Sequence, residues 1–175
     1  EVEVVAPTAE STPEGWTKIE FKANTPIMTE VAVRGVDPDG IDVQNLTLFC
    51  FNDYGLYITH VEAELNPTIE VPSLSGTYKA VIPDDTRIIH FVANQNPNLY
   101  DASTFVNRTE DEIQDGMVGA SGMIIYWSRF IFNSNDGFQH QLAEANNGEG
   151  IKLIRNQAKI SIENPSNDYI DISGF

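Results

Sequence analysis

The chain has 175 residues, of which 41% are hydrophobic, and carries a formal net charge of −16. This length and apolar content suit one folded domain with a sizeable core and exclude a disordered chain. The acidic balance argues against nucleic acid as a partner, because phosphate binding needs clustered Lys and Arg. It argues equally against binding to an anionic membrane surface. No apolar run approaches the roughly 20 residues that a membrane-spanning helix needs.

Residues 1–16 are expected to form a flexible acidic leader, because they are rich in Glu, Pro, Thr and Ser and show no periodicity. Residues 17–175 are expected to form a single domain. The single cysteine, Cys50, excludes an internal disulfide. Its apolar neighbours in Leu-Phe-Cys-Phe predict a small buried side chain rather than a nucleophile.

Two predicted strands lie on either side of a polar linker near the start of the domain. In Thr17–Ala23, apolar and charged residues alternate, which is typical of a strand with one buried face. Val43–Phe51 is apolar on both faces and is predicted to lie deep in the core. The linker holds Arg34 in an exposed-looking Val-Ala-Val-Arg-Gly loop, followed by the turn signal Asp-Pro-Asp-Gly at residues 37–40.

The remaining strands follow at short intervals with turn signals between them. Asn52–Gly55 is predicted to be a hairpin turn that leads into Leu56–Leu65. One face of that strand is expected to consist of Tyr57, Thr59, Val61, Ala63 and Leu65. Further strands are expected at Thr77–Ile82, Arg87–Asn94, Gly122–Phe132, Ile151–Glu163 and Tyr169–Phe175.

A short stretch interrupts the β pattern. Thr109-Glu110-Asp111-Glu112 has the spacing of a capping box, which predicts a short helical insertion near residues 104–116. Residues 138–150 are expected to be a polar connection without regular structure. An all-β fold of about seven strands with turns between them favours a β-sandwich.

No constellation of residues predicts a metal site or a cofactor. His60 and His90 fall in separate strands and His140 in a polar segment, so no pair has the short spacing of zinc ligands. The acidic turns at residues 37–42 and 133–137 do not place glycine where a calcium loop requires it. We therefore expect solvated turns there, and we expect no cofactor.

The sequence also gives no sign of an enzyme. It lacks a nucleophile elbow and a phosphate-cradling glycine loop. A hydrolase with two facing carboxylates stays open in principle, because 26 acidic residues always allow some pair. Four aromatic residues could stack on a sugar, but the core is the expected place for them: Tyr54, Tyr57, Tyr126 and Trp127.

The order of these segments from Thr17 onward resembles the N-terminal domain of the Bacteroidales fimbrillins, the type V pilin subunits of Bacteroides and Porphyromonas relatives. A first strand (Ile19-Glu-Phe21) precedes an arginine-bearing loop (Val33-Arg34-Gly35) and a strand that ends in Asn-Asp-Tyr-Gly. The later segments that resemble the family are Tyr78–Pro83, Ile88–Asn94, Gly122–Trp127 and Leu153–Ile160.

The resemblance implies a transthyretin-like or Greek-key β-sandwich that forms the N-terminal domain of a longer, two-domain subunit. It implies a structural subunit of cell-surface fimbriae that supports adhesion, is exported as a lipoprotein precursor and lies at the outer membrane. An arginine-directed surface protease would cut after Arg34, leaving Gly35 as the new N-terminus. A strand from another fimbrial subunit would then replace the lost first strand.

Two departures keep other readings open. We expect no second sandwich domain within these 175 residues, and Gly35 stands where the family favours a small residue such as Ala. The alternatives are a surface lipoprotein that binds a glycan or protein ligand from host or bacterial surfaces, or a fimbrial anchor or tip subunit that does not polymerise.

Overall fold

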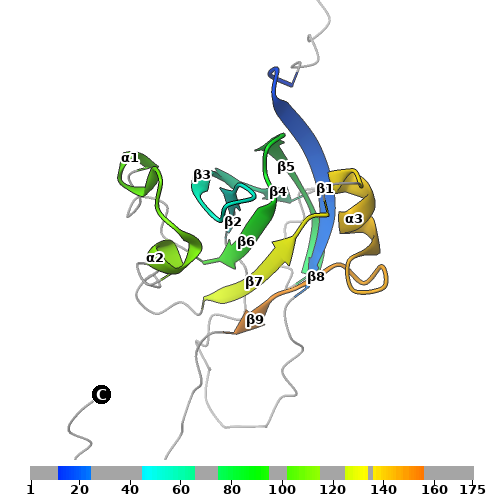
Figure 1. The fold of residues 1–175 in the computed structure, drawn as a ribbon. Helices are drawn as coiled ribbons and strands as arrows, with labels where there is room; N and C mark the ends of the chain where they lie inside the picture. The colour runs from blue at the N-terminus through cyan, green and yellow to red at the C-terminus, as the bar shows by residue number, and fades with distance from the viewer. Residues whose placement is uncertain are drawn as a thin grey trace, which may run out of the picture.

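The computed structural model describes residues 12–24, 45–65, 75–94, 102–114, 125–133 and 136–155. Within these ranges the chain forms two β-sheets that face each other, with three short helices (Figure 1). The predicted β-sandwich is therefore confirmed. The described ranges hold nine strands rather than about seven, because three of them are only two residues long.

The four-stranded sheet has the order β4-β5-β1-β8. It consists of β4 (Glu64–Leu65), β5 (Ser75–Pro83), β1 (Trp16–Asn24) and β8 (Ile151–Lys152). The five-stranded sheet has the order β3-β2-β6-β7-β9. It consists of β3 (Tyr57–Glu62), β2 (Leu46–Phe51), β6 (Ile88–Ala93), β7 (Tyr126–Ile131) and β9 (Ile154–Arg155).

The main core fills the space between the sheets. The alternation in the first strand is confirmed, because Ile19, Phe21 and Ala23 are buried while the charged residues between them are exposed. These side chains pack with inward-facing residues of the five-stranded sheet, which include Leu48, Cys50, Ile89, Phe91 and Tyr126.

The outer face of the five-stranded sheet carries a second apolar cluster. Phe49, Phe51 and Val92 point to this side and pack with Ile113 of a covering helix. A sheet that meets the core on one face and helices on the other buries the residues on both faces of its strands, which are mostly apolar. This explains why all residues of β2 and β6 are buried.

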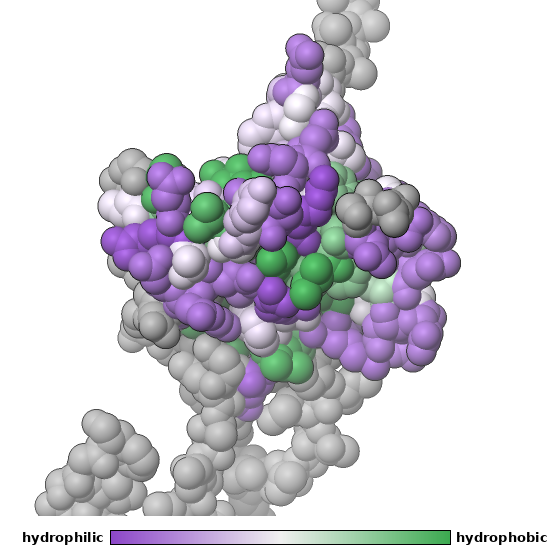
Figure 2. Space-filling model, viewed as in Figure 1, coloured by the Kyte–Doolittle hydropathy of each residue, from purple (hydrophilic) through white to green (hydrophobic). Residues whose placement is uncertain are grey.

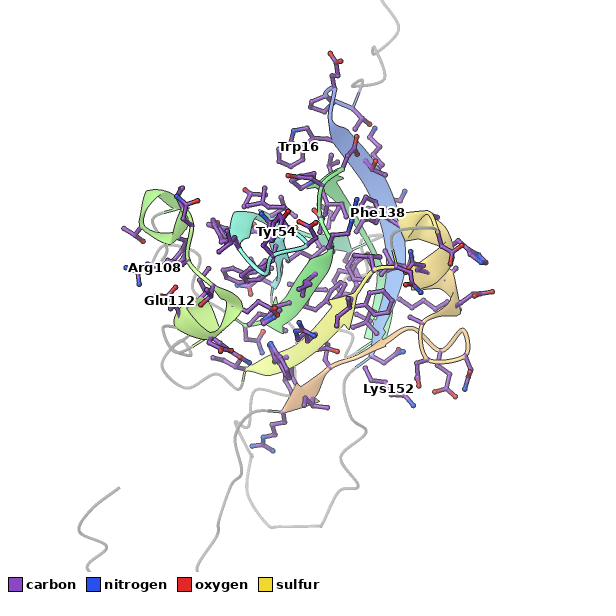
Figure 3. The ribbon with its side chains drawn as sticks, viewed as in Figure 1. Trp16, Tyr54, Arg108, Glu112, Phe138 and Lys152 are labelled. Atoms are coloured by element: carbon purple, nitrogen blue, oxygen red, sulfur yellow. The ribbon has the colours of Figure 1, made fainter. Side chains whose placement is uncertain are left out.

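Helix α1 (Ala102–Phe105) and helix α2 (Glu110–Gln114) confirm the predicted helical insertion. The capping box is present, since Thr109 N donates to Glu112 Oε2 at 2.9 Å and Glu112 N lies 3.5 Å from Thr109 Oγ1. The two labelled residues Arg108 and Glu112 lie on this helical side, away from Phe138 (Figure 3).

Helix α3 (Phe138–Glu144) contradicts the expected polar connection at residues 138–150. Its apolar residues Phe138, Leu142 and Ala145 follow the i, i+4, i+7 spacing of one helix face. Leu142 and Ala145 are buried in the main core, and Phe138 packs against it. The helical spacing of these apolar residues is present in the sequence, but it is short and lies among polar residues. The helix was not predicted for that reason.

Two predicted long strands each divide between the sheets, which corrects the expectation for Leu56–Leu65 and Ile151–Glu163. β3 belongs to the five-stranded sheet and β4 to the other, with Ala63 between them. β8 and β9 divide in the same way at Leu153. At each crossing the intervening residue still donates to the sheet the chain is leaving: Ala63 N to Leu46 O and Leu153 N to Asn24 O, both at 2.8 Å.

Tyr57 also departs from its predicted face. A register shift at Cys50 and Phe51 places Tyr57 opposite Phe51, whereas Thr59 lies opposite Cys50. Such a β-bulge adds one residue to one strand and reverses which face the following side chains occupy. Tyr57 therefore packs in the outer cluster, while Val61 and Leu65 pack against the main core.

Several predictions fall outside the described residues. These are Arg34, Gly35, the acidic turn at residues 37–42, the extension of the last long strand beyond residue 155, and the strand Tyr169–Phe175. The division into leader and domain is also untested, because residues 1–11 are not described. None of the helices in the described ranges has the length and apolar character to cross a membrane.

Candidate functional site: the first strand and its slot

β1 is an inner strand of the four-stranded sheet although it is the first strand of the described residues. It pairs antiparallel with β5 along its whole length, from Trp16 opposite Pro83 to Asn24 opposite Ser75. On its other side it pairs with β8 at Ala23 and Asn24. β1 therefore fills a slot whose walls belong to later parts of the chain.

The floor of this slot is the five-stranded sheet. The ring of Phe21 meets Phe91 of β6 edge to face with centroids 5.0 Å apart, and stacks beside Tyr78 of β5 at 5.9 Å. Ile19 and Ala23 are 2% and 1% exposed, so all three inward side chains of β1 are desolvated. Burial of large apolar side chains contributes roughly 1.5–3 kcal/mol each, which makes this row the main attachment of β1.

Hydrogen bonds hold the two ends of β1. At its start, Asp84 N donates to Gly15 O at 2.9 Å, and Thr17 Oγ1 donates to the Asp84 carboxylate at 2.5 Å. At its end, Asn24 O accepts from Leu153 N, and the Asn24 side-chain amide donates to the carbonyl of Glu149. Trp16 marks the first end in Figure 3.

Helix α3 covers the edge of β1 that β8 does not reach (Figure 1). Gln139 accepts from Glu20 N at 2.8 Å and donates to Glu20 O at 2.7 Å. A shallow hollow of about 210 Å³ lies here, lined by β1, Thr77 of β5 and the inner side of α3. The surface around α3, at the right of Figure 2, is mostly hydrophilic.

The charges along β1 add little to its attachment. Glu20 and Lys79 form a cross-strand pair at 3.8 Å, with both side chains about half exposed. Exposed pairs of this kind contribute at most about 1 kcal/mol. The apolar row and the backbone bonds therefore dominate, and neither requires a particular side chain at the outward positions.

A polar cluster that was not predicted from the sequence lies on the outer face of the five-stranded sheet. His90 is 1% exposed, and its Nε2 lies 2.6 Å from Glu110 Oε2. Trp127 Nε1 donates to His90 Nδ1 at 3.3 Å, and Arg129 contacts both Glu110 oxygens, at 2.5 and 2.9 Å. Because Nδ1 accepts from the indole, Nε2 carries the proton and the imidazole is neutral.

This cluster fastens α2 to the sheet. Burial lowers the pKa of His90 more than its contact with Glu110 raises it. The guanidinium of Arg129 lowers the pKa of the Glu110 carboxyl and keeps it ionised. Nothing in the local sequence of β6 indicates that His90 belongs to a cluster, because its partners lie on other elements.

The other candidate residues considered from the sequence, the remaining histidines and Cys50, do not lie together in one site. His60 Nδ1 lies 2.5 Å from the Tyr57 hydroxyl, and His140 is an exposed partner of Glu144 on α3. Among the described residues no group of His, Cys, Asp and Glu has the arrangement of a metal site. Cys50 is buried, and desolvation raises the pKa of its thiol to about 12.

The predicted aromatic residues do not form a planar row. Tyr57 and Tyr126 are buried in core clusters, and Trp127 packs against the outer cluster, as expected. The expectation of a core position is wrong for Tyr54, which is 82% exposed because it lies on the hairpin turn between β2 and β3. The described part of the chain therefore offers a strand slot rather than a stacking platform as its most developed site.

No protein-family model and no curated protein matches the chain. A similarity was found to the crystal structure of "a putative cell adhesion protein" from Bacteroides eggerthii, with 14% sequence identity and a TM-score of 0.35. It covers 79% of this chain and 39% of the other, so the chain spans less than half the length of that protein. A similarity of this degree assigns neither a family nor a function.

Proposed function

We propose that the protein is a non-catalytic structural subunit of cell-surface fimbriae, located at the outer membrane, that supports adhesion. Cleavage after Arg34 would separate β1 from the rest of the chain, and a strand of another subunit would take its place. The position of β1 carries this proposal: it is the first strand of the described residues, lies inside a sheet, and is joined to β2 by residues 25–44, which include Arg34.

General physical chemistry supports the replacement of β1 by another strand after cleavage. After a cut in that linker, non-covalent contacts alone would retain β1. An empty slot would expose an apolar floor and the unpaired backbone edge of β5, and a new strand would bind there by β-augmentation. The sequence resemblance to the fimbrillins, with Arg34 in the loop after the first strand, supports the same reading.

The experiment is expression of the full-length native subunit in a cell that assembles it, with Arg34→Ala as the variant. Arg108→Ala is the matched control, because it changes an exposed arginine in the turn between α1 and α2. The Arg34→Ala protein should remain monomeric on SDS gels while wild type and control form a ladder. A ladder from the Arg34→Ala protein would contradict cleavage at this position.

The second candidate is a fimbrial anchor, which would keep β1 in place. The hydrogen bonds that attach β1 to the rest of the domain favour this candidate. Both ends of the strand and the middle of its outer edge are hydrogen-bonded. A subunit that retains β1 would stay monomeric and would keep its original N-terminus. The same gel separates the two candidates, since an anchor gives no ladder with or without Arg34.

A further inference from the structure

The hydrogen bonds that Gln139 forms with β1 are made to the backbone of the strand. The side-chain amide of Gln139 has a carbonyl oxygen and an N–H donor that point to the same side, so it can bond both the N–H and the C=O of a single strand residue. These bond the N–H and the C=O of Glu20 at 2.8 and 2.7 Å, as an adjacent strand would. The Glu20 side chain itself points to solvent.

α3 packs against β1, but it is also held by residues that follow β7 in the chain, and these contacts do not involve β1. Gln141 accepts from Asn133 N at 2.7 Å and donates to Asn133 O at 3.0 Å, just beyond the end of β7. Phe138 meets Phe132 edge to face with centroids 4.8 Å apart, and Leu142 is 1% exposed. Gln139 would thus stay beside the slot after β1 has gone.

The inward positions of the slot differ in size. The site of Phe21 takes an aromatic ring between Tyr78 and Phe91. The site of Ala23 is 1% exposed and takes a small side chain, with Gly76 opposite on β5. Filling a closed site with a larger side chain forces its neighbours to move, so Ala23 marks the most restrictive position.

On the basis of the proposed function, we infer that the slot recognises its incoming strand in two separate ways. Gln139 binds the backbone of the residue at position 20, whatever its side chain. The positions of Ile19, Phe21 and Ala23 select the sequence. The partner is an extended segment of another subunit with the pattern aliphatic, any residue, aromatic, any residue, small, running antiparallel to β5 as β1 does.

The test uses the full chain with a specific protease site placed at residue 34, cut while folded. Labelled peptides of residues 12–24 are then exchanged into the cut protein, and their dissociation constants are compared. The Glu20→Gln peptide should bind within about fivefold of the parent, because it loses only the exposed pair with Lys79. The Phe21→Ala and Ala23→Leu peptides should bind at least about tenfold more weakly.

Gln139→Ala in the protein should weaken every peptide by the same factor, about fivefold to tenfold, because each side chain–backbone hydrogen bond makes a modest net contribution. His140→Ala is the control, since this neighbour on α3 is exposed. A peptide with an N-methyl group on residue 20 loses the backbone donor. Its penalty should be smaller in the Gln139→Ala protein than in the parent.

The outcomes separate the inference from the proposed function. If no peptide exchanges into the cut protein, strand replacement itself fails and the proposed function falls with it. If peptides exchange but all bind alike, or if Gln139→Ala leaves their affinities unchanged, strand replacement stands and the two-part recognition is overturned. The expected pattern of selective binding with a uniform Gln139 effect supports both.

Discussion

Phe21 of β1 and Phe91 of β6 meet edge to face with ring centroids 5.0 Å apart, and this contact joins the two sheets. Both rings are buried, at 3% and 0% exposure. Phe21→Ala should lower the free energy of unfolding by about 3–5 kcal/mol, because it removes a buried ring and leaves a cavity. Urea denaturation followed by circular dichroism measures the loss.

Lys22→Ala is the matched control for Phe21→Ala, since the neighbouring side chain points outward. It should change the stability by no more than about 0.5 kcal/mol. A loss below about 1 kcal/mol for Phe21→Ala would mean that β1 contributes little to the core.

Gly150 lies against the backbone of β1. Its φ is +96°, and a Cβ there would stand 2.6 Å from Lys22 O. Gly148 has a similar φ of +82°, but its nearest neighbour for a Cβ, Ala143 O, is 3.8 Å away. Gly148→Ala should cost about 1–2 kcal/mol of stability from backbone strain alone.

Gly150→Ala should cost clearly more than Gly148→Ala, because the added methyl also pushes on β1. Thermal denaturation of the two variants side by side makes the comparison. Equal losses would show that β1 does not press on this turn.

His90 should make stability depend on pH. Burial lowers its folded-state pKa below the ordinary value of 6.5, so folding favours the neutral ring. The charged groups near it are Glu110, Arg129 and Asp111. The stabilisation is complete above the unfolded-state pKa and declines as pH falls from about 6.5 towards the lower folded-state pKa.

Urea midpoints of wild type and His90→Gln at about pH 7.5 and pH 5.5 test this dependence. The wild type should lose more stability than the variant over this interval. His140→Gln, which changes an exposed histidine outside this cluster, is the control variant. An identical decline in wild type and His90→Gln would assign the effect to other groups.

Cys50 should be inert in the folded protein. Its thiol is fully buried in the main core, and burial raises its pKa to about 12. A thiol-reactive chromogenic reagent at neutral pH should modify it only as fast as the protein opens. In denaturant the reaction should be complete within minutes. Rapid modification of the native protein would contradict the burial of this strand.

The sequence predicted the elements better than their assignment to sheets. The alternation in β1 and the apolar run of β2 were sufficient, because period and burial are local properties. Ala63 and Leu153 show where this fails: a strand that crosses between two facing sheets can keep its inward alternation, since both sheets face the same core. The pattern therefore cannot distinguish one long strand from two short ones.

The candidate site was predicted only in part. The inward row of β1 followed from its alternation, but its inner position in the sheet depends on pairing with β5 and β8, which is non-local. Gln139 and the contact of His90 with Glu110 also join residues far apart in the sequence. Arg34 lies outside the described residues, so its role stays a prediction from sequence.

The most direct test of the strand-replacement account is the N-terminus of the protein recovered from the native cell surface. Intact mass and N-terminal sequencing should give a chain that begins at Gly35, lacks β1, and runs as an SDS-resistant ladder. A chain that begins upstream of Glu1 with lipid attached, retains β1, and forms no ladder would contradict the account.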